Sequence, residues 1–206
     1  PEPQAIWRKS LTEQQWAAAA DASFLRDAKS EERGEWRLKP KMPSRWHICY
    51  DYKDMHLKMR LGLTSFKHVG IFPEQAANWE FIYDTVEELR GAGIERPKVL
   101  NLFAYTGGAT LAARAAGADV THVDSVKQVV TWSRENMESS GLDGVRWIVE
   151  DATKFVEREV RRGNKYHGII LDPPAYGRGA NGEKWVLESD ICHMLETCAQ
   201  LLEPTN

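Results

Sequence analysis

The chain has 206 residues, of which 42% are hydrophobic and 28% charged, and its formal net charge is −3. This apolar content excludes an intrinsically disordered or collagen-like chain and suits one large domain, or one domain with a small appendage. The small negative charge gives no overall attraction for a polyanion, so any contact with nucleic acid needs a local basic patch.

Membrane, secretory and metal-binding signals do not stand out in the sequence. The apolar runs are far shorter than the ~20 residues of a membrane span, and residues 1–3 do not begin a secretory signal. Three cysteines without a C-x-x-C pair predict free thiols in a reducing compartment, and the six histidines show no metal-binding spacing. We therefore expect a cytoplasmic protein without a metal site.

Residues 1–65 predict a small β-rich appendage. Alternation with a period of two runs through residues 35–39, 46–50 and 55–61, and the polar residues 51–54 form a turn between the last two runs. Such alternation is typical of antiparallel strands with one solvated face, so we expect a short β-meander.

Residues 66–206 predict an α/β domain. Apolar residues at helical spacing predict a first helix over 74–90. Strands are then expected at 98–103, 119–123, 145–149 and 166–171. Helices are expected at 108–116, at 126–139, after the third strand as far as residue 162, and at 185–202. This alternation predicts a Rossmann-like, doubly wound, mainly parallel sheet with right-handed crossovers.

The loop after the first of these strands is a candidate ligand site, because open parallel sheets bind ligands at the carboxyl ends of their strands. Glycines there allow a tight turn and close approach to a ligand, and the next helix N-terminus favours an anionic group. An ordinary strand-to-helix turn is the alternative. The loop lacks G-x-G-x-x-G, which argues against NAD. The sequence of this loop is Phe103-Ala104-Tyr105-Thr106-Gly107-Gly108.

Acidic residues follow the second and third strands of the predicted sheet. Asp124 is placed to accept both hydrogen bonds of a ribose diol, and a helix cap is its alternative role. Asp151 is placed to accept from an adenine amino group, or to cap the helix that follows. A glycine turn followed by these two acids predicts a nucleoside site.

A rigid turn follows the fourth strand, with the sequence Asp172-Pro173-Pro174-Ala175-Tyr176. Two consecutive prolines fix their φ angles and donate no hydrogen bond, so their carbonyls are expected to remain free acceptors. A rigid carbonyl beside an aromatic ring could hold a planar acceptor group against an electrophile. A strand terminator with Tyr176 packed in the core is the alternative.

Together these segments resemble class I S-adenosylmethionine-dependent methyltransferases. Residues 101–108 resemble their motif I and residues 172–176 their motif IV, and the nearer resemblance is to the bacterial 23S ribosomal RNA large-subunit methyltransferase family. That family also has a G-x-F-x-acid-Q segment, matched here by residues 70–75, with Asn78 in a family position. The resemblance covers about residues 66–203.

The resemblance implies S-adenosylmethionine as the cofactor and RNA as the acceptor. Asp124 would hold the ribose and Asp151 the adenine. The methionine portion would be surrounded by Phe103, Tyr105, Thr106 and Gly107, with Glu74, Gln75 and Asn78 closing one side. The acceptor would be positioned by the catalytic set Asp172, Pro173, Pro174 and Tyr176.

Several departures from the family keep the acceptor open. Ala76 and Trp79 stand where many relatives have arginines, Ala175 separates the prolines from the aromatic residue, and no cysteine follows a strand end. The first departure weakens an RNA assignment, and the other two weaken adenine-N6 and cytosine-C5 chemistry. The family's RNA-binding accessory domain is not recognisable in residues 1–65. A protein or small-molecule acceptor, or a binding module without transferase activity, remains an alternative.

Three further segments carry weaker expectations. The basic run over 158–165 is interrupted by Glu157 and Glu159 and predicts a solvated helix face. Residues 177–184 suit either a mobile lid or a surface loop. The strand at 166–171 would expose an unpaired edge, so we expect the C-terminal strands of the sheet to lie beyond residue 206 or to come from another chain in an oligomer.

Overall fold

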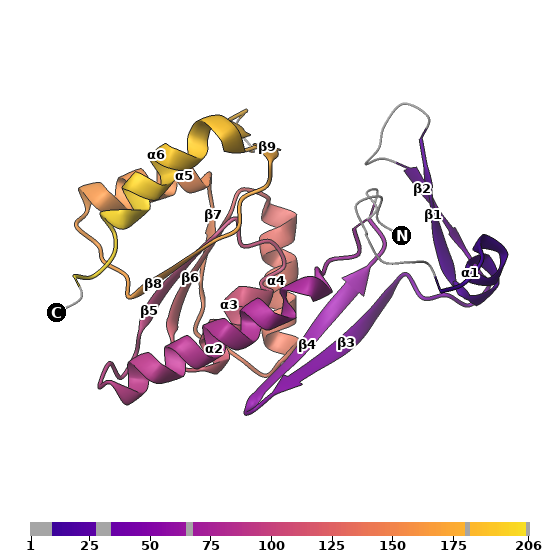
Figure 1. The fold of residues 1–206 in the computed structure, drawn as a ribbon, viewed down its shortest axis with the longest axis horizontal. Coiled ribbons are helices and arrows are strands. Elements are labelled where there is room, and N and C mark those ends of the chain that lie inside the picture. The colour runs from indigo at the N-terminus through magenta and orange to yellow at the C-terminus, as the bar shows by residue number, and fades with distance from the viewer. Residues whose placement is uncertain (1–9, 28–33, 65–67, 180–181, 205–206) are drawn as a thin grey trace. The chain divides into compact units, whose positions relative to one another are not determined.

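The computed structural model describes residues 10–27, 34–64, 68–179 and 182–204 (Figure 1). The chain forms two compact units. The smaller comprises Pro1–Trp46 with Leu61–Val69, and the larger comprises His47–Arg60 with Gly70–Asn206. The sequence analysis placed all of residues 1–65 in one appendage, whereas the contacts assign residues 47–60 to the larger unit.

In the smaller unit, helix α1 (Glu13–Ala19) precedes the antiparallel strands β1 (Ala22–Arg26) and β2 (Gly34–Leu38). Thr12 caps the helix: its hydroxyl accepts from the backbone N–H of Gln15, whose side chain accepts from the backbone N–H of Thr12. This T-x-x-Q pattern is a helix-start signal that the sequence analysis did not use. Strand β2 corresponds to the alternation at 35–39.

A second pair of strands, β3 (Arg45–Tyr52) and β4 (Met55–Gly62), confirms the predicted alternation and turn. The antiparallel strands form two separate two-stranded sheets, however, and not one meander. Alternate side chains explain why residues 47–60 join the larger unit. The Tyr52 hydroxyl donates to Asp84 Oδ2 at 2.8 Å, and one face of β4 is buried through Met55, Leu57 and Met59.

The larger unit is built on a parallel sheet with the strand order β7-β6-β5-β8. Its strands are β5 (Lys98–Leu102), β6 (Asp119–Asp124), β7 (Arg146–Val149) and β8 (Gly168–Leu171). Its helices are α2 (Ala76–Gly91), α3 (Gly108–Ala115), α4 (Lys127–Ser139), α5 (Ala152–Arg161) and α6 (Leu187–Ala199). The predicted Rossmann-like α/β fold is therefore confirmed.

Helices cover both faces of this sheet (Figure 1). Val99 and Val120 face the core shared with α2 and α3, whereas Leu100 and Leu102 face the core shared with α5 and α6. Adjacent residues of β5 thus point to opposite cores, as expected for a parallel strand buried on both sides.

The segment after β8 differs from the prediction. Residues 185 and 186, expected in the final helix, belong to β10 (Lys184–Val186), which pairs with β9 (Tyr176–Arg178), and α6 starts only at Leu187. The candidate lid at 177–184 therefore includes parts of a small antiparallel pair. Its residues 180 and 181 lie outside the described residues.

Strand β8 lies at one edge of the four-stranded sheet, as the sequence analysis expected. Just before β8, the backbone N–H of Tyr166 donates to Leu201 O at 2.8 Å, and that of Glu203 donates to Tyr166 O at 2.9 Å. Tyr166 and Leu202 form a parallel bridge there. Further strands along this edge stay a prediction.

The basic run over 158–165 lies at the surface as predicted, with Arg161 and Arg162 exposed, but Glu159 within this segment of the chain is fully buried. Its Oε2 accepts from the Tyr166 hydroxyl and from Asn164 Nδ2, each at 2.8 Å. Burial would raise the pKa of Glu159, but these hydrogen bonds and the charge of Arg146 outweigh burial and hold it below its ordinary value. The carboxylate ties α5 to the start of the β8 segment.

Glu159→Gln should lower the free energy of unfolding by about 1 to 3 kcal/mol at neutral pH, because charged hydrogen bonds are lost in a buried site. Since the folded-state pKa is lowered, the stabilisation is present above the unfolded-state pKa of about 4.3 and is lost as pH falls through the folded-state pKa. Urea unfolding of both proteins at neutral and acidic pH tests this. A stability difference that does not shrink on acidification would contradict the role of the charge.

Candidate active site

The loop after β5 has a strained backbone. Phe103, Tyr105 and Gly107 have φ angles of 53°, 49° and 91°, all in the left-handed region. This region suits glycine but is costly for aromatic residues, and such outliers gather at functional sites. The surrounding structure must hold the loop in place, and this points to function.

Contacts from distant segments supply that support. The Thr106 hydroxyl donates to Gly70 O at 2.7 Å, and Asn136 Nδ2 donates to Thr106 O at 2.9 Å. The backbone N–H of Tyr105 donates to Asp124 Oδ2 at 3.0 Å. The loop is therefore fixed from α4, from the segment before α2 and from the end of β6.

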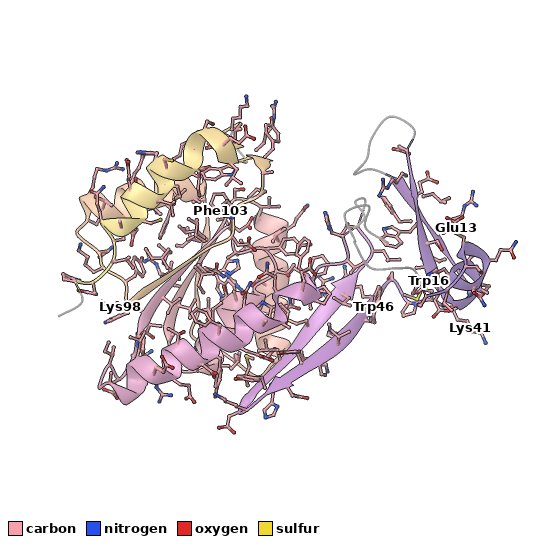
Figure 2. The ribbon with its side chains drawn as sticks, in the orientation of Figure 1. Glu13, Trp16, Lys41, Trp46, Lys98 and Phe103 are labelled. Atoms are coloured by element: carbon pink, nitrogen blue, oxygen red, sulfur yellow. The ribbon has the colours of Figure 1, made fainter. Side chains whose placement is uncertain are left out.

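A cavity of about 340 Å³ lies beside this loop, within the size range of small-molecule sites. It is lined by the carboxyl ends of β5 and β8 and by the start of α2. Lys98 and Phe103 mark the two ends of β5, and the cavity lies at the Phe103 end (Figure 2). This is the edge that the parallel sheet predicts for a ligand.

Seven of the predicted site residues line the cavity: Gln75, Asn78, Phe103, Tyr105, Thr106, Gly107 and Asp172. The other six predicted residues are not part of its lining: Glu74, Asp124, Asp151, Pro173, Pro174 and Tyr176. Residues from three separate stretches of the sequence are thus gathered, and the two acids assigned to the nucleoside lie outside the cavity.

Asp124 ends β6 and lies one hydrogen bond away from the cavity, through Tyr105. Its Oδ1 accepts from the backbone N–H of Val126 at 2.9 Å. Burial raises the pKa of Asp124, and the two backbone hydrogen bonds lower it by less. Helix α4 takes Val126 as its N-cap residue, so Asp124 holds the approach to the helix and the neighbouring loop.

Asp151 has the structural role that the sequence analysis kept as an alternative. It is the N-cap of α5, and its Oδ1 accepts from the backbone N–H of Lys154 at 3.0 Å. Contact between Asp151 and an adenine stays a prediction.

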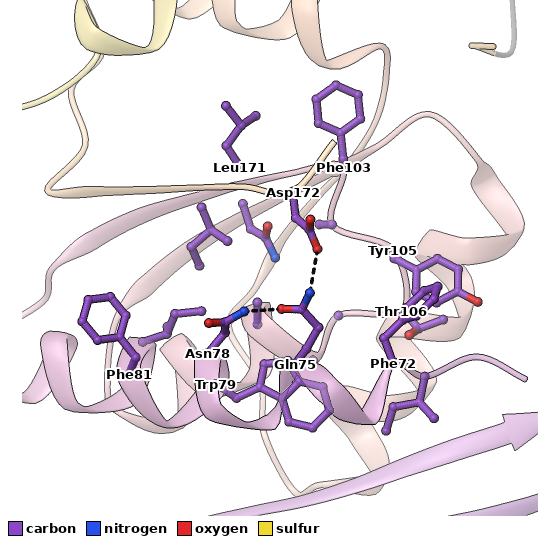
Figure 3. A pocket seen from close by; sticks show the side chains of 18 of the residues that line it. Phe72, Gln75, Asn78, Trp79, Phe81, Phe103, Tyr105, Thr106, Leu171 and Asp172 are labelled. Carbon is purple, nitrogen blue, oxygen red and sulfur yellow. Dashed lines mark hydrogen bonds between the residues drawn. The ribbon is translucent and has the colours of Figure 1, made fainter. Parts of the chain in front are cut away.

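Three polar side chains form a chain across the cavity (Figure 3). Gln75 Nε2 donates to Asp172 Oδ2 at 3.3 Å, and Asn78 Nδ2 donates to Gln75 Oε1 at 2.6 Å. Because the Asp172 carboxylate only accepts, the chain fixes which way both amides point. This chain of hydrogen bonds connects the segment over residues 70–78, which resembles the family, to the Asp-Pro-Pro turn at residues 172–174.

The proline turn is only partly free to act on a ligand. Trp185 Nε1 donates to Pro174 O at 2.7 Å, so this carbonyl holds β10 and is not the free acceptor that we expected. Tyr176 begins β9, and its side chain is 52% exposed. This exposure contradicts the packing of Tyr176 in the core that the structural alternative assumed.

The sequence analysis missed several residues that line the cavity, among them Phe72, Asn101 and Phe81. The sequence signal at Phe81 is weak. The buried face of α2 is marked by Trp79, Tyr83 and Val86, and Phe81 lies off that face. Single exposed apolar residues are common, so it is the place of Phe81 in the cavity lining that marks it as a site residue.

Among the described residues, no three His, Cys, Asp or Glu side chains are grouped so that they could hold a metal ion. No helix in the same part of the chain is long and apolar enough to cross a membrane.

Comparison with known proteins gives one family. The sequence profile described as "S-adenosylmethionine-dependent methyltransferase" matches residues 4–206. The Ribosomal RNA large subunit methyltransferase K/L of Shewanella frigidimarina is 30% identical over 151 residues, covering 71% of this chain and 20% of that protein. The enzyme of the same name from Pseudoalteromonas atlantica is 29% identical over 150 residues, with the same shares.

Among solved structures, the SAM Dependent Methyltransferase from Agrobacterium tumefaciens is 42% identical with a TM-score of 0.86. The match covers 99% of this chain and 62% of that one. The chain therefore spans about a fifth of the length of the curated relatives it matches, and less than two thirds of this structural relative.

Proposed function

The chain belongs to the S-adenosylmethionine-dependent methyltransferase family, and on that premise we propose that it transfers a methyl group from S-adenosylmethionine to RNA. The main support from the site is the strained loop at residues 103–107, held by Asp124 at the carboxyl edge of the sheet. RNA as the acceptor is supported by the names of the curated relatives. An RNA acceptor also fits the predicted cytoplasmic location.

The polar groups in and beside the cavity fit this cofactor. Each Asp124 oxygen accepts one backbone N–H, so each keeps a lone pair for one hydroxyl of a ribose diol. Helix α3 has Gly107 as its N-cap residue and no side-chain cap, so its first N–H groups can receive the carboxylate of a methionine portion. Asp172 places a carboxylate at the cavity, where it favours a cationic group.

When bound, S-adenosylmethionine supplies a methyl group on a positively charged sulfur. The protein's contribution is to hold the reacting groups in line and to exclude water. The braced loop at 103–107 orients the cofactor side, since its strained backbone leaves little freedom for reorganisation. The rings of Phe72 and Tyr105, 5.4 Å apart, both line the cavity on that side.

On the acceptor side we assign Asp172, Pro173 and Tyr176, with Pro174 holding the turn through Trp185. Gln75 and Asn78 lie at the junction between both sides, because Gln75 is hydrogen-bonded to Asp172. Asp172 can accept a proton or a hydrogen bond from the acceptor, and the proline turn keeps its backbone rigid.

Tyr176→Ala should leave the affinity for S-adenosylhomocysteine nearly unchanged and lower methyl transfer at least about tenfold, because the ring is assigned to the acceptor. Tyr176→Phe keeps the ring and should retain most of the transfer. Calorimetry and single-turnover transfer measure the two effects. Equal losses of affinity and turnover in Tyr176→Ala would move this residue to the cofactor side.

The proposed function is tested by incubating the protein with methyl-labelled S-adenosylmethionine and hypomodified ribosomal RNA, ribosomal subunits, or a protein extract free of RNA. We expect label in RNA that is sensitive to ribonuclease. Label that enters only the protein extract or a small-molecule fraction would replace RNA by another acceptor class.

A further inference from the structure

Phe81 has the largest exposed fraction, 71%, among the large apolar side chains of the described residues. It nevertheless lines the cavity beside the strained loop. Its backbone carbonyl accepts from the Thr85 hydroxyl within α2. This hydrogen bond does not involve the ring. A large exposed ring in the lining of a ligand cavity offers an aromatic or apolar contact surface to the ligand.

The polar neighbours of Phe81 narrow the choice of partner. Asn78 and Phe81 are three residues apart on α2 and are therefore neighbours on the helix surface, and Gln75 precedes the helix as its N-cap residue (Figure 3). Gln75 takes one N–H of the Asn78 amide at 2.6 Å and fixes its direction. The Asn78 oxygen and its second N–H remain as an acceptor and a donor side by side.

A ring face next to a fixed amide edge is the combination that recognises an unpaired nucleobase. Bases stack on aromatic rings regardless of sequence, and an asparagine amide can pair with a base edge through one donor and one acceptor. A base inside a duplex offers neither its face nor a free edge.

We propose that Phe81 is a stacking platform for an unpaired RNA base at the mouth of the cavity, with Asn78 reading the edge of that base. This deepens the proposed function and rests on RNA being the acceptor. The platform lies on α2, while Asp172 at the end of β8 is on the acceptor side of the same cavity, and the Gln75 amide links the two. Phe81 is thus a positioning residue that brings single-stranded RNA to the site.

The test measures RNA binding separately from catalysis. Fluorescence anisotropy with a short fluorescein-labelled single-stranded oligoadenylate, at fixed salt and with saturating S-adenosylhomocysteine, gives Kd for the wild type and for Phe81 variants. Stacking of one base on an aromatic ring raises affinity by about ten- to a hundredfold, so Phe81→Ala should weaken RNA binding about tenfold or more.

Matched variants distinguish stacking on the ring from the effect of apolar side-chain volume. Phe81→Trp keeps a stacking surface and should bind as the wild type does, whereas Phe81→Leu keeps apolar volume without a ring and should resemble Phe81→Ala. Leu195→Ala, another exposed apolar position at 53% on α6, should change nothing. Affinity for S-adenosylhomocysteine should be unchanged in all four. Duplex RNA should compete poorly.

The results test the stacking platform separately from the proposed methyl transfer to RNA. Equal RNA affinity in wild type and Phe81→Ala, equal affinity of the Leu and Trp variants, or full competition by duplex RNA would overturn the platform. Binding that depends on the ring, together with no methyl transfer to any RNA, would leave the platform supported and defeat the proposed function.

Discussion

Gly107→Ala should lower the free energy of unfolding by about 2 to 5 kcal/mol, which combines left-handed strain with overpacking. Gly107 has a φ of 91°, and a Cβ there would lie 1.9 Å from the hydroxyl oxygen of Ser133. Relief requires rotation of the buried Ser133 hydroxyl or movement of α4 or of the loop, and the Ser133 Cβ, 3.2 Å from the added atom, keeps the site tight. Displacement of this loop should also weaken S-adenosylhomocysteine binding by more than about tenfold.

Gly93→Ala is the matched control for this substitution. Gly93 has a similar φ of 99°, but an added Cβ meets no atom within 4 Å. It should show the strain alone, about 1 to 2 kcal/mol, with unchanged cofactor affinity. Thermal unfolding and calorimetry of both variants check this. Equal destabilisation of the two would show that the contact with Ser133 does not matter.

Asp124→Ala should weaken S-adenosylhomocysteine binding by about 1 to 3 kcal/mol, because charge-assisted hydrogen bonds to a ribose diol are lost. It should also lower stability, since the backbone N–H groups of Tyr105 and Val126 lose their acceptor. Asp124→Asn keeps one acceptor oxygen and should recover part of the stability without recovering the affinity.

The raised pKa of Asp124, caused by burial, adds a pH test. Ligand hydroxyls need the ionised carboxylate, so affinity should fall as pH drops through a value above the ordinary 3.9, and Asp124→Asn should lack this titration. Asp119→Ala, at the opposite end of β6, is the control and should bind normally. Destabilised Asp124 variants with wild-type affinity and the same pH profile would limit Asp124 to bracing the loop.

Much of the larger unit follows from the sequence because its signals are local. Apolar runs such as residues 98–102 have the length of buried strands, and the predicted parallel order needs only their alternation with helices. The smaller unit was predicted less well. Its helix α1 has no buried residue, so hydrophobic periodicity could not reveal it, and only the capping pattern at Thr12 marked its start.

The candidate site was also only partly predictable from the sequence. Residues at or just after strand ends, such as Asp124 and Asp172, could be located because topology fixes where strand ends meet. Side-chain partners could not. The hydrogen bond from Trp185 to the Pro174 carbonyl and the chain from Asn78 through Gln75 to Asp172 depend on how loops pack, which no local pattern encodes.

Calorimetric titration of the protein with S-adenosylhomocysteine tests the central claim most directly. The cofactor site at the carboxyl edge of β5, β6 and β8 predicts one binding event per chain in the low micromolar range or tighter, roughly −8 kcal/mol, and predicts that the event is weakened by Gly107→Ala but unaffected by Gly93→Ala. No detectable heat with S-adenosylhomocysteine or S-adenosylmethionine, alongside tight binding of NAD, would contradict the account.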